Sequence, residues 1–312
     1  MRGQGLTRTL RLLLGLLLAG LILSVQTSSA QDAKNTDVRP NPEGVKSAAA
    51  RQEDLKFPAK ASSLGIFSGL DNGFFRPDGV GPFPAVVFLH TCGGVRDDLR
   101  AWTKAALKLG YVVLIPDSMR GAKTNCFLPL AVSDGRRAKD AMDAVAHLAK
   151  QSFVDATRIY AVGFSQGTHA AEMVAGSALA AAVVSPGSPR FAALAGLYGA
   201  CGFDGVPPKL PHREYLQRDT DRPLLLLMAE ADNETPASFC LERLPKLKEA
   251  GAPVEWHVYP GNVTHCWDCS TLNGLVKTDF RGTRVTYQYS ETVTEDSRKR
   301  VFEFFARQIS NQ

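Results

Sequence analysis

Three features that would assign the chain to common non-enzymatic classes are missing from its sequence. The 312 residues contain no run of five or more basic residues with interleaved aromatics, a pattern typical of nucleic-acid-binding segments. No internal repeat period is present. The longest apolar stretch, 12–25, has fourteen residues, fewer than the roughly 20 that a membrane-spanning helix needs. These absences argue against a nucleic-acid-binding, repeat or membrane-spanning protein.

The first thirty residues have the three-part pattern of a secretory signal peptide. Arg2, Arg8 and Arg11 precede the apolar stretch, and small residues follow it up to Ala30. We therefore predict a signal peptide over 1–30 and an exported protein, periplasmic or secreted. A membrane anchor is the alternative, but the stretch is short for one, so no stable membrane insertion is expected after cleavage. Cleavage lowers the formal charge from +5 to +2, because it removes three arginines and no acidic residue.

Six cysteines in an exported chain favour disulfides, because the compartment is oxidising. Their spacing leaves the pairing open, since six cysteines allow 15 connectivities. Cys266 and Cys269 form a CxxC, which is either a redox dithiol or a structural bridge. It follows a glycine turn late in the chain instead of opening a helix after a strand, and this favours the structural alternative. No second cysteine or histidine pair has zinc-ligand spacing, so neither a metal nor an organic cofactor is expected.

Domain organisation follows from composition and periodicity. The polar segment 31–54 has no sustained apolar period, which predicts a flexible leader before a catalytic domain over 55–312. In that domain, apolar runs alternate with segments of helical spacing. The alternation predicts an α/β fold with a mostly parallel, doubly wound sheet and helices on both faces. We expect strands at 85–89, 111–115, 158–162, 195–198, 223–228 and 254–259, and helices at 99–109, from Ser133 or Asp134 through Leu148, at 168–178, 237–250 and 294–309.

The pentapeptide GFSQG at 163–167 stands between a predicted strand and a predicted helix. A GxSxG match alone is weak, but this placement is typical of a nucleophile elbow, a sharp turn that exposes a serine hydroxyl. The helix that follows would place its positive end near that hydroxyl. We therefore predict Ser165 as a nucleophile.

A serine hydroxyl needs a base, and the base needs an orienting acid. Asp232 follows the strand at 223–228, and His265 follows the strand at 254–259, so both would lie at the same sheet edge as Ser165. We predict Asp232 as the acid and His265 as the base. Glu230, Glu234 and Asp221 compete with Asp232, although Asp221 precedes its strand. The other histidines are less well placed: His147 in a helix, His257 in a strand and His212 in a loop insertion.

Acyl transfer also requires donors for the developing oxyanion. One is predicted to be the backbone N–H of Gln166, directly after the nucleophile. The other should come from the glycine-containing loop HTCGG at 90–94, where we favour the amide of Cys92, with Thr91 second. We expect His90 to shape this loop and His169 to pack in its helix, and neither to act as a second base.

The segments GPFPAVVFLH, HTCGG, GFSQG, AEADNETP and YPGNVTH together resemble the dienelactone hydrolase family of α/β-hydrolases, over roughly residue 55 to the C-terminus. The resemblance implies the α/β-hydrolase fold and hydrolysis of small-molecule ester or lactone substrates, with Ser165, Asp232 and His265 as the catalytic triad. Founding members carry cysteine where this chain has Ser165. The resemblance further implies three disulfides: Cys92 with Cys126, Cys201 with Cys240, and Cys266 with Cys269.

Other functions share these residues. A peptidase or acyltransferase would use the same triad, a binding protein could keep the fold without turnover, and a thiol oxidoreductase would depend on Cys266 and Cys269. Substrate choice depends on how 199–222 and 271–290 fold over the site. We expect 199–222, rich in proline and glycine, to form its roof.

Overall fold

The computed structural model describes residues 55–58, 60–61, 73–127, 130–203, 212–279 and 281–309. The predicted signal peptide and leader lie outside these residues, so both stay predictions, as does the start of the domain at residue 55. Within the described ranges, no helix combines the length and apolar character that crossing a membrane requires.

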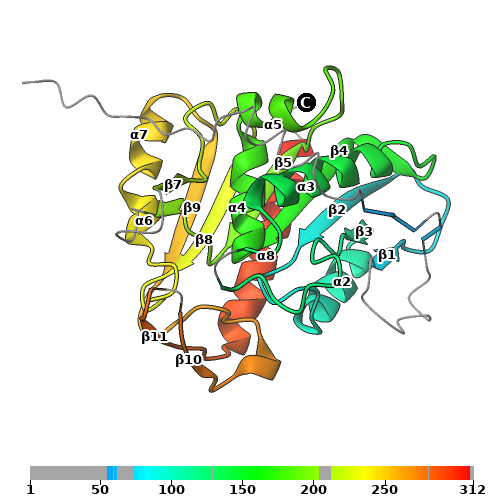
Figure 1. Ribbon diagram of the computed structural model, residues 1–312. Helices are drawn as coiled ribbons and strands as arrows, with labels where there is room; N and C mark the ends of the chain where they lie inside the picture. The colour runs from blue at the N-terminus through cyan, green and yellow to red at the C-terminus, as the bar shows by residue number, and fades with distance from the viewer. Residues whose placement is uncertain are drawn as a thin grey trace, which may run out of the picture. The chain divides into compact units, whose positions relative to one another are not determined.

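A seven-stranded sheet of order β1-β3-β2-β4-β5-β8-β9 forms the centre of the fold (Figure 1). β1 pairs antiparallel with β3, and every other neighbouring pair is parallel. The central strands are apolar where both of their faces are buried. The predicted α/β class and mostly parallel sheet are confirmed. The strands are β1 (Gly73–Phe75), β2 (Phe83–Leu89), β3 (Val112–Ile115), β4 (Val154–Phe164), β5 (Ala193–Leu197), β8 (Leu224–Ala229) and β9 (Val254–Tyr259).

Helices cover both faces of this sheet and enclose two apolar cores (Figure 1). Alternate residues of each strand point to opposite faces, so Val87 lies in one core and Val86 in the other. The first core is covered by α3 (Asp134–Leu148), α4 (Gln166–Ala175) and α5 (Ser177–Val183), and the second by α2 (Asp98–Lys108) and α8 (Glu291–Ile309).

Two helix predictions need correction. The segment 237–250 forms two short helices, α6 (Ser238–Leu241) and α7 (Leu244–Glu249), instead of one. Pro245 lies in the first turn of α7, where a missing N–H is tolerated, but it could not continue a helix arriving from α6. The helix predicted at 168–178 begins earlier, at Gln166, and stops at Gly176, whose extended backbone separates α4 from α5.

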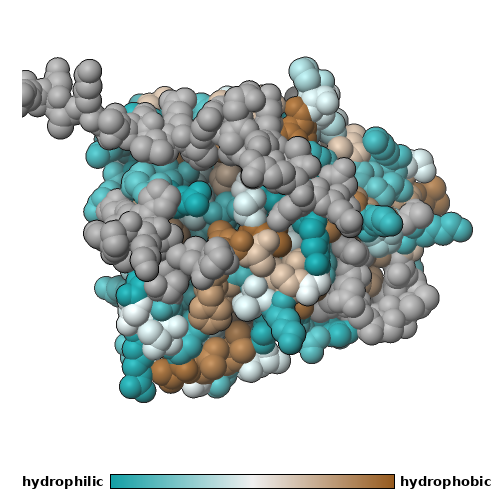
Figure 2. Space-filling view, viewed as in Figure 1, coloured by the Kyte–Doolittle hydropathy of each residue, from teal (hydrophilic) through white to brown (hydrophobic). Residues whose placement is uncertain are grey.

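Two small antiparallel pairs lie outside the main sheet. The first is β6 (Gly202–Phe203) with β7 (Arg213–Glu214), and the second is β10 (Val276–Thr278) with β11 (Arg284–Thr286). A short 3-10 helix, η2 (Ser270–Leu272), precedes β10. Leu275 and Val276 are exposed, and Figure 2 shows apolar surface at the bottom of the view, over β10 and the segment before it.

The parallel order of β4, β8 and β9 determines where the candidate residues lie. The carboxyl ends of parallel strands meet at one edge of the sheet, and ligand sites of open α/β folds form there. Ser165 directly follows β4, Asp232 lies in the turn after β8, and His265 lies in the loop after β9. All three therefore arrive at the same edge.

Candidate active site

The turn between β4 and α4 forces Ser165 into an unusual backbone conformation. Its φ is 50° and its ψ is −116°, a region that L-residues rarely occupy, so the turn stores strain at this residue. The flanking glycines are sterically required. A Cβ on Gly163 would overlap the carbonyl oxygen of Gly167, and a Cβ on Gly167 would overlap that of Leu89. The strand, turn and helix predicted for GFSQG are present, with the serine at the apex.

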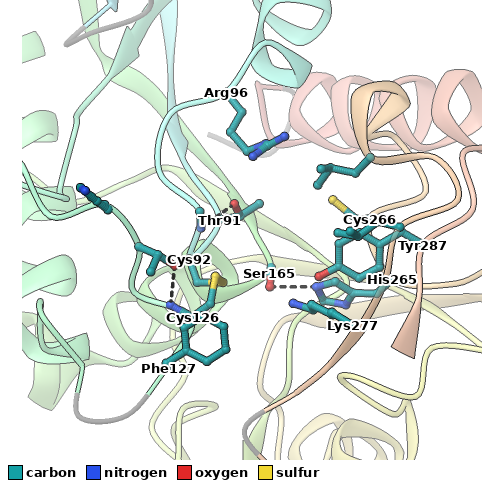
Figure 3. Close-up of a pocket in the computed structure, with 15 residues that line it drawn as sticks. Thr91, Cys92, Arg96, Cys126, Phe127, Ser165, His265, Cys266, Lys277 and Tyr287 are labelled. Carbon is teal, nitrogen blue, oxygen red and sulfur yellow. Dashed lines mark hydrogen bonds between the residues drawn. A yellow bond between two sulfur atoms is a disulfide. The ribbon is translucent and has the colours of Figure 1, made fainter. Parts of the chain in front are cut away.

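Ser165, His265 and Asp232 form a continuous hydrogen-bonded chain. The distance from Ser165 Oγ to His265 Nε2 is 2.9 Å, and that from His265 Nδ1 to Asp232 Oδ2 is 2.8 Å. Figure 3 shows the first of these bonds at the floor of a pocket. Ser165 keeps only 8% of its surface exposed, His265 2% and Asp232 3%, so water competes little for these bonds. The structure thus brings together the three residues predicted as a triad.

The Asp232 carboxylate is held in place by its own turn. Its Oδ1 accepts hydrogen bonds from the backbone N–H groups of Glu234 and Thr235, each 2.9 Å long. The Thr235 hydroxyl lies 2.8 Å from Asp232 Oδ2 and 2.9 Å from the carbonyl oxygen of Tyr198, either of which can accept its proton. Sequence reasoning did not single out Thr235. Its signal was the spacing Asp-x-x-Thr, in which an aspartate closes a turn on later amides.

The competing acids have other partners. Asp221 pairs with Arg190 at 2.7 Å. Glu230 accepts from the N–H of Gly261 at 2.8 Å. Glu234 comes nearest to the site, where it pairs with Lys277 at 2.8 Å and accepts from the Tyr287 hydroxyl at 2.7 Å.

The charges around His265 favour protonation of its imidazole ring. Burial disfavours the imidazolium, but the carboxylates of Asp232 and Glu234 outweigh it and raise the pKa of His265 above its ordinary 6.5. An imidazole with a raised pKa is a stronger base toward the Ser165 hydroxyl.

The buried side chains of Tyr198 and Asp268 support the His265 ring, and the sequence did not reveal this arrangement. The Tyr198 ring meets it edge-on, with centroids 4.9 Å apart. Tyr198 donates to Asp268 at 2.7 Å, and the Trp102 indole N–H donates to the same carboxylate at 2.8 Å. Burial raises the pKa of Asp268, although these two donors oppose the shift. These residues come from separate elements, so no local pattern could have pointed to the group.

Within the described part of the chain, the two predicted oxyanion donors, the backbone N–H groups of Gln166 and Cys92, have no backbone acceptor. The Gln166 amide begins α4, where a helix has no internal acceptor for it. The Cys92 amide belongs to a tight turn in which Gly94 N–H donates to the Thr91 carbonyl at 3.2 Å. Their role as donors stays a prediction.

The two remaining histidines have structural surroundings. His90 Nε2 accepts from the backbone N–H of Ser118 at 3.0 Å, and burial together with the charge of Arg137 lowers the pKa of His90 to about 3. His169 stacks on Tyr215 with centroids 3.9 Å apart. Both arrangements agree with the expectation that neither histidine is a second base.

A pocket of about 270 Å³ opens above Ser165 (Figure 3). Its described walls come from the loop after β2, from 123–127 and from 265–287, and they carry three cationic side chains and no acidic one. We expected 199–222 to form the roof of the site. None of its described residues lines this pocket, so the prediction is wrong for those residues. Phe203 instead packs edge-on against Tyr215 and Phe239, on the side of the sheet covered by α4. The lining residues are Thr91, Cys92, Gly93, Arg96, Lys123, Thr124, Cys126, Phe127, Ser165, His265, Cys266, Leu272, Leu275, Lys277 and Tyr287.

All six cysteines are paired, in the three disulfides that the family resemblance implied. Both cysteines of the Cys92–Cys126 bridge line the pocket, and so does Cys266 of the Cys266–Cys269 bridge. The two described clusters with metal-ligand geometry consist of bonded cysteines and one carboxylate each, and bonded sulfur is not the thiolate that a metal requires.

Comparison with known proteins identifies the family. The family model for the Dienelactone hydrolase family matches residues 70–309. A Klebsiella pneumoniae structure assigned to the dienelactone hydrolases shares 21% identity and a TM-score of 0.56, over 74% of this chain and 90% of that chain. The esterase Est2 of Thermogutta terrifontis, bound to propionate, shares 15% identity and a TM-score of 0.54, over 76% and 88%. The same esterase phosphonylated by cyclosarin has 16% identity and a TM-score of 0.54, over 76% and 88%. No curated protein sequence matches. Since the family match covers most of the chain, the protein belongs to the dienelactone hydrolase family.

Proposed function

We propose that this protein is a serine hydrolase that cleaves small carboxylic esters or lactones through an acyl-enzyme on Ser165. The observation that carries the proposal is the chain of hydrogen bonds from Ser165 Oγ through His265 to Asp232, at 2.9 and 2.8 Å. Family membership supports hydrolysis of ester bonds. So does the esterase of similar fold whose structures have propionate bound or are phosphonylated.

In the first half-reaction, Ser165 Oγ attacks the ester carbonyl carbon while its proton passes to His265 Nε2. The carbonyl electron pair moves to oxygen, which the amides of Gln166 and Cys92 stabilise. The tetrahedral species then collapses, the bond to the alcohol oxygen breaks, and the proton returns from Nε2 to that oxygen. In the second half, water repeats the attack with His265 again as base, and the carboxylic acid and free serine are formed.

The pocket is small. Its volume of about 270 Å³ is close to the lower end of the range of about 300–1,000 Å³ found for ligand pockets. Phe127, Leu272 and Leu275 offer apolar contact on its walls. We therefore propose esters of short acids, or small lactones, as substrates.

The proposal is tested with a fluorophosphonate probe, which reacts covalently with activated serines. We expect labelling of the wild-type protein, with the added mass on the peptide that contains Ser165, and no labelling of Ser165→Ala. The control is Ser185→Ala, which removes an exposed hydroxyl outside the pocket and should label like the wild type. Labelling that survives Ser165→Ala would overturn the proposal.

The pH dependence of kcat/KM should have an acidic limb above pH 6.5. His265 accepts a proton only when neutral, and its raised pKa means that activity falls as pH decreases through a value higher than the ordinary one. Glu234→Gln removes one carboxylate that raises this pKa, so the limb should move to lower pH. A wild-type limb at or below 6.5, measured from initial rates, would contradict the assignment.

We also propose export, with cleavage after Ala30. Three disulfides support it, because such bonds persist in oxidising compartments. N-terminal sequencing of the mature protein should begin at Gln31, and its intact mass should lack the six thiol hydrogens. A mature chain that keeps residues 1–30 would contradict cleavage after Ala30, and free thiols in it would remove the support that the disulfides give to export.

A further inference from the structure

The two amides assigned to the oxyanion belong to different segments, yet one buried group of side chains ties those segments together. Gln166 begins α4, and Cys92 lies in the loop after β2. Arg137 and Asn125 each bond to both segments. We propose that Arg137 and Asn125 are positioning residues that set the spacing of the Gln166 and Cys92 amides, acting through the side-chain oxygen of Gln166. This inference rests on the proposed function.

Arg137, on α3, makes the first connection. Its Nη1 donates to Gln166 Oε1 at 2.7 Å, and its Nη2 donates to the backbone carbonyl oxygen of His90. The residue at the start of the β2 loop and the residue after the nucleophile are thus held by one planar guanidinium. A guanidinium presents its donors in a fixed fork, which suits a distance-setting role better than a flexible ammonium does.

Asn125 makes the second connection. Its backbone N–H donates to the Cys92 carbonyl oxygen at 2.7 Å, and its side-chain amide donates to Gln166 Oε1 at 3.0 Å. The same amide group donates to the Val132 carbonyl and accepts from the Val132 N–H, so its orientation is defined. Cys126, the next residue, is bonded to Cys92. The segment 124–126 therefore contacts the Cys92 loop through both a hydrogen bond and a disulfide.

The contact between Arg137 and the His90 ring is not part of this group. His90 Nε2 accepts from Ser118, so in the neutral ring Nδ1 carries the proton and donates to the Thr91 carbonyl at 2.7 Å. A protonated Nδ1 cannot accept from Arg137, although the two nitrogens are 3.3 Å apart. The bond to the His90 carbonyl is the one that restrains the loop.

The burial of Arg137 argues for function more than for stability. The side chain is 2% exposed, and its Nε has no partner among the described atoms. Burial lowers the pKa of Arg137 to about 10, while Asp134, Asp140 and Asp117 oppose the shift, so the group stays charged at neutral pH. Buried charges stabilise a fold weakly, and apolar residues of similar volume often serve as well.

Neither Arg137 nor Asn125 lines the pocket, so neither touches substrate in this arrangement. Their effect on the reaction must pass through the positions of the two amides. Oxyanion donors act most strongly in the transition state, so a displaced donor should lower kcat with little change in KM.

The test uses two variants that keep the folded core. Gln166→Met removes the shared oxygen but keeps the backbone amide and the side-chain length. Arg137→Lys keeps the charge that balances Asp134, but one ammonium cannot hold both oxygens in the same geometry. We expect each to lower kcat for p-nitrophenyl acetate at least about tenfold, short of the 10²–10³-fold lost when a donor itself is removed. KM should change less than about threefold.

Two further measurements separate positioning from general damage. A boronic acid forms a tetrahedral adduct with the serine, so its inhibition constant should rise by about the factor lost in kcat, whereas affinity for the product acid should not change. The double variant should lose little more than either single one, because both act through one oxygen. The matched control is Arg190→Lys, which alters an arginine bonded to Asp221 and to the carbonyls at the end of α4, and should leave kcat unchanged.

The outcomes are distinct. If the wild-type protein is not labelled by the fluorophosphonate, the proposed function fails. If it is labelled but both variants keep the wild-type kcat, only the positioning role is wrong. A loss that appears equally in kcat, in product affinity and in Arg190→Lys would also overturn it, because that pattern indicates a destabilised fold.

Discussion

Ser165→Ala is expected to lower kcat for p-nitrophenyl acetate by at least about 10⁴-fold, because no other described group on the pocket wall has its oxygen 2.9 Å from His265 Nε2. The change removes one oxygen atom from a residue that is 8% exposed, and the backbone strain of the turn is the same for alanine as for serine. KM and the melting temperature should therefore change little.

The kcat values of the wild type and Ser165→Ala are compared from stopped-flow or plate-reader rates, with the concentration of active wild-type enzyme taken from active-site titration. Ser185→Ala serves as control here as well and should retain full activity. If Ser165→Ala keeps more than about a hundredth of the wild-type kcat, hydrolysis does not depend on this nucleophile and the acyl-enzyme mechanism is wrong.

Asp232→Asn should be the second most damaging change, with kcat lower by about 10⁴-fold, as found when the corresponding aspartate of another serine hydrolase is changed. Two backbone amides hold Oδ1, so the asparagine oxygen would take that place and its NH₂ group would face His265. That NH₂ would donate to Nδ1 and place the ring proton on Nε2. A protonated Nε2 cannot accept the Ser165 proton.

Glu234→Gln is the matched control for Asp232→Asn, because it alters the neighbouring carboxylate, which bonds to Lys277 and Tyr287 and not to the histidine ring. We expect a loss of less than about tenfold in kcat at the pH optimum. Equal losses in the two variants would show that the assignment of Asp232 as the orienting acid is wrong.

Much of the fold was predictable because its signals are local. Continuous apolar runs identify strands buried on both faces, and the periodic segments between them identify the covering helices. The elbow was predictable because GxSxG between a strand and a helix is a local pattern, and Gly163 is required by a contact within the turn, although Gly167 is required by a contact with the distant Leu89. The helix at 237–250 was mispredicted because its apolar spacing continued across Pro245, which the periodicity does not register.

The surroundings of the triad were not predictable. Tyr198, Asp268 and Trp102 come from three separate elements and meet only in the folded core. The pocket wall was likewise missed in part, because 123–127 has no pattern of its own and is held near the site by Asn125 and Cys126.

Residue patterns alone predicted the class of fold, the order of the candidate nucleophile, acid and base along the chain, and which strand end each one follows. Three features became apparent only in the folded chain. Ser165, His265 and Asp232 lie within hydrogen-bonding distance. Lys277 of β10 and Tyr287 after β11 line the pocket, whereas no described residue of 199–222 does, and Arg137 and Asn125 connect the segments that carry Gln166 and Cys92. The difference lies in the range of the interactions. Strands, helices and sharp turns are specified by neighbours in the chain, whereas hydrogen bonds between side chains on separate elements depend on how the whole sheet and its helices pack.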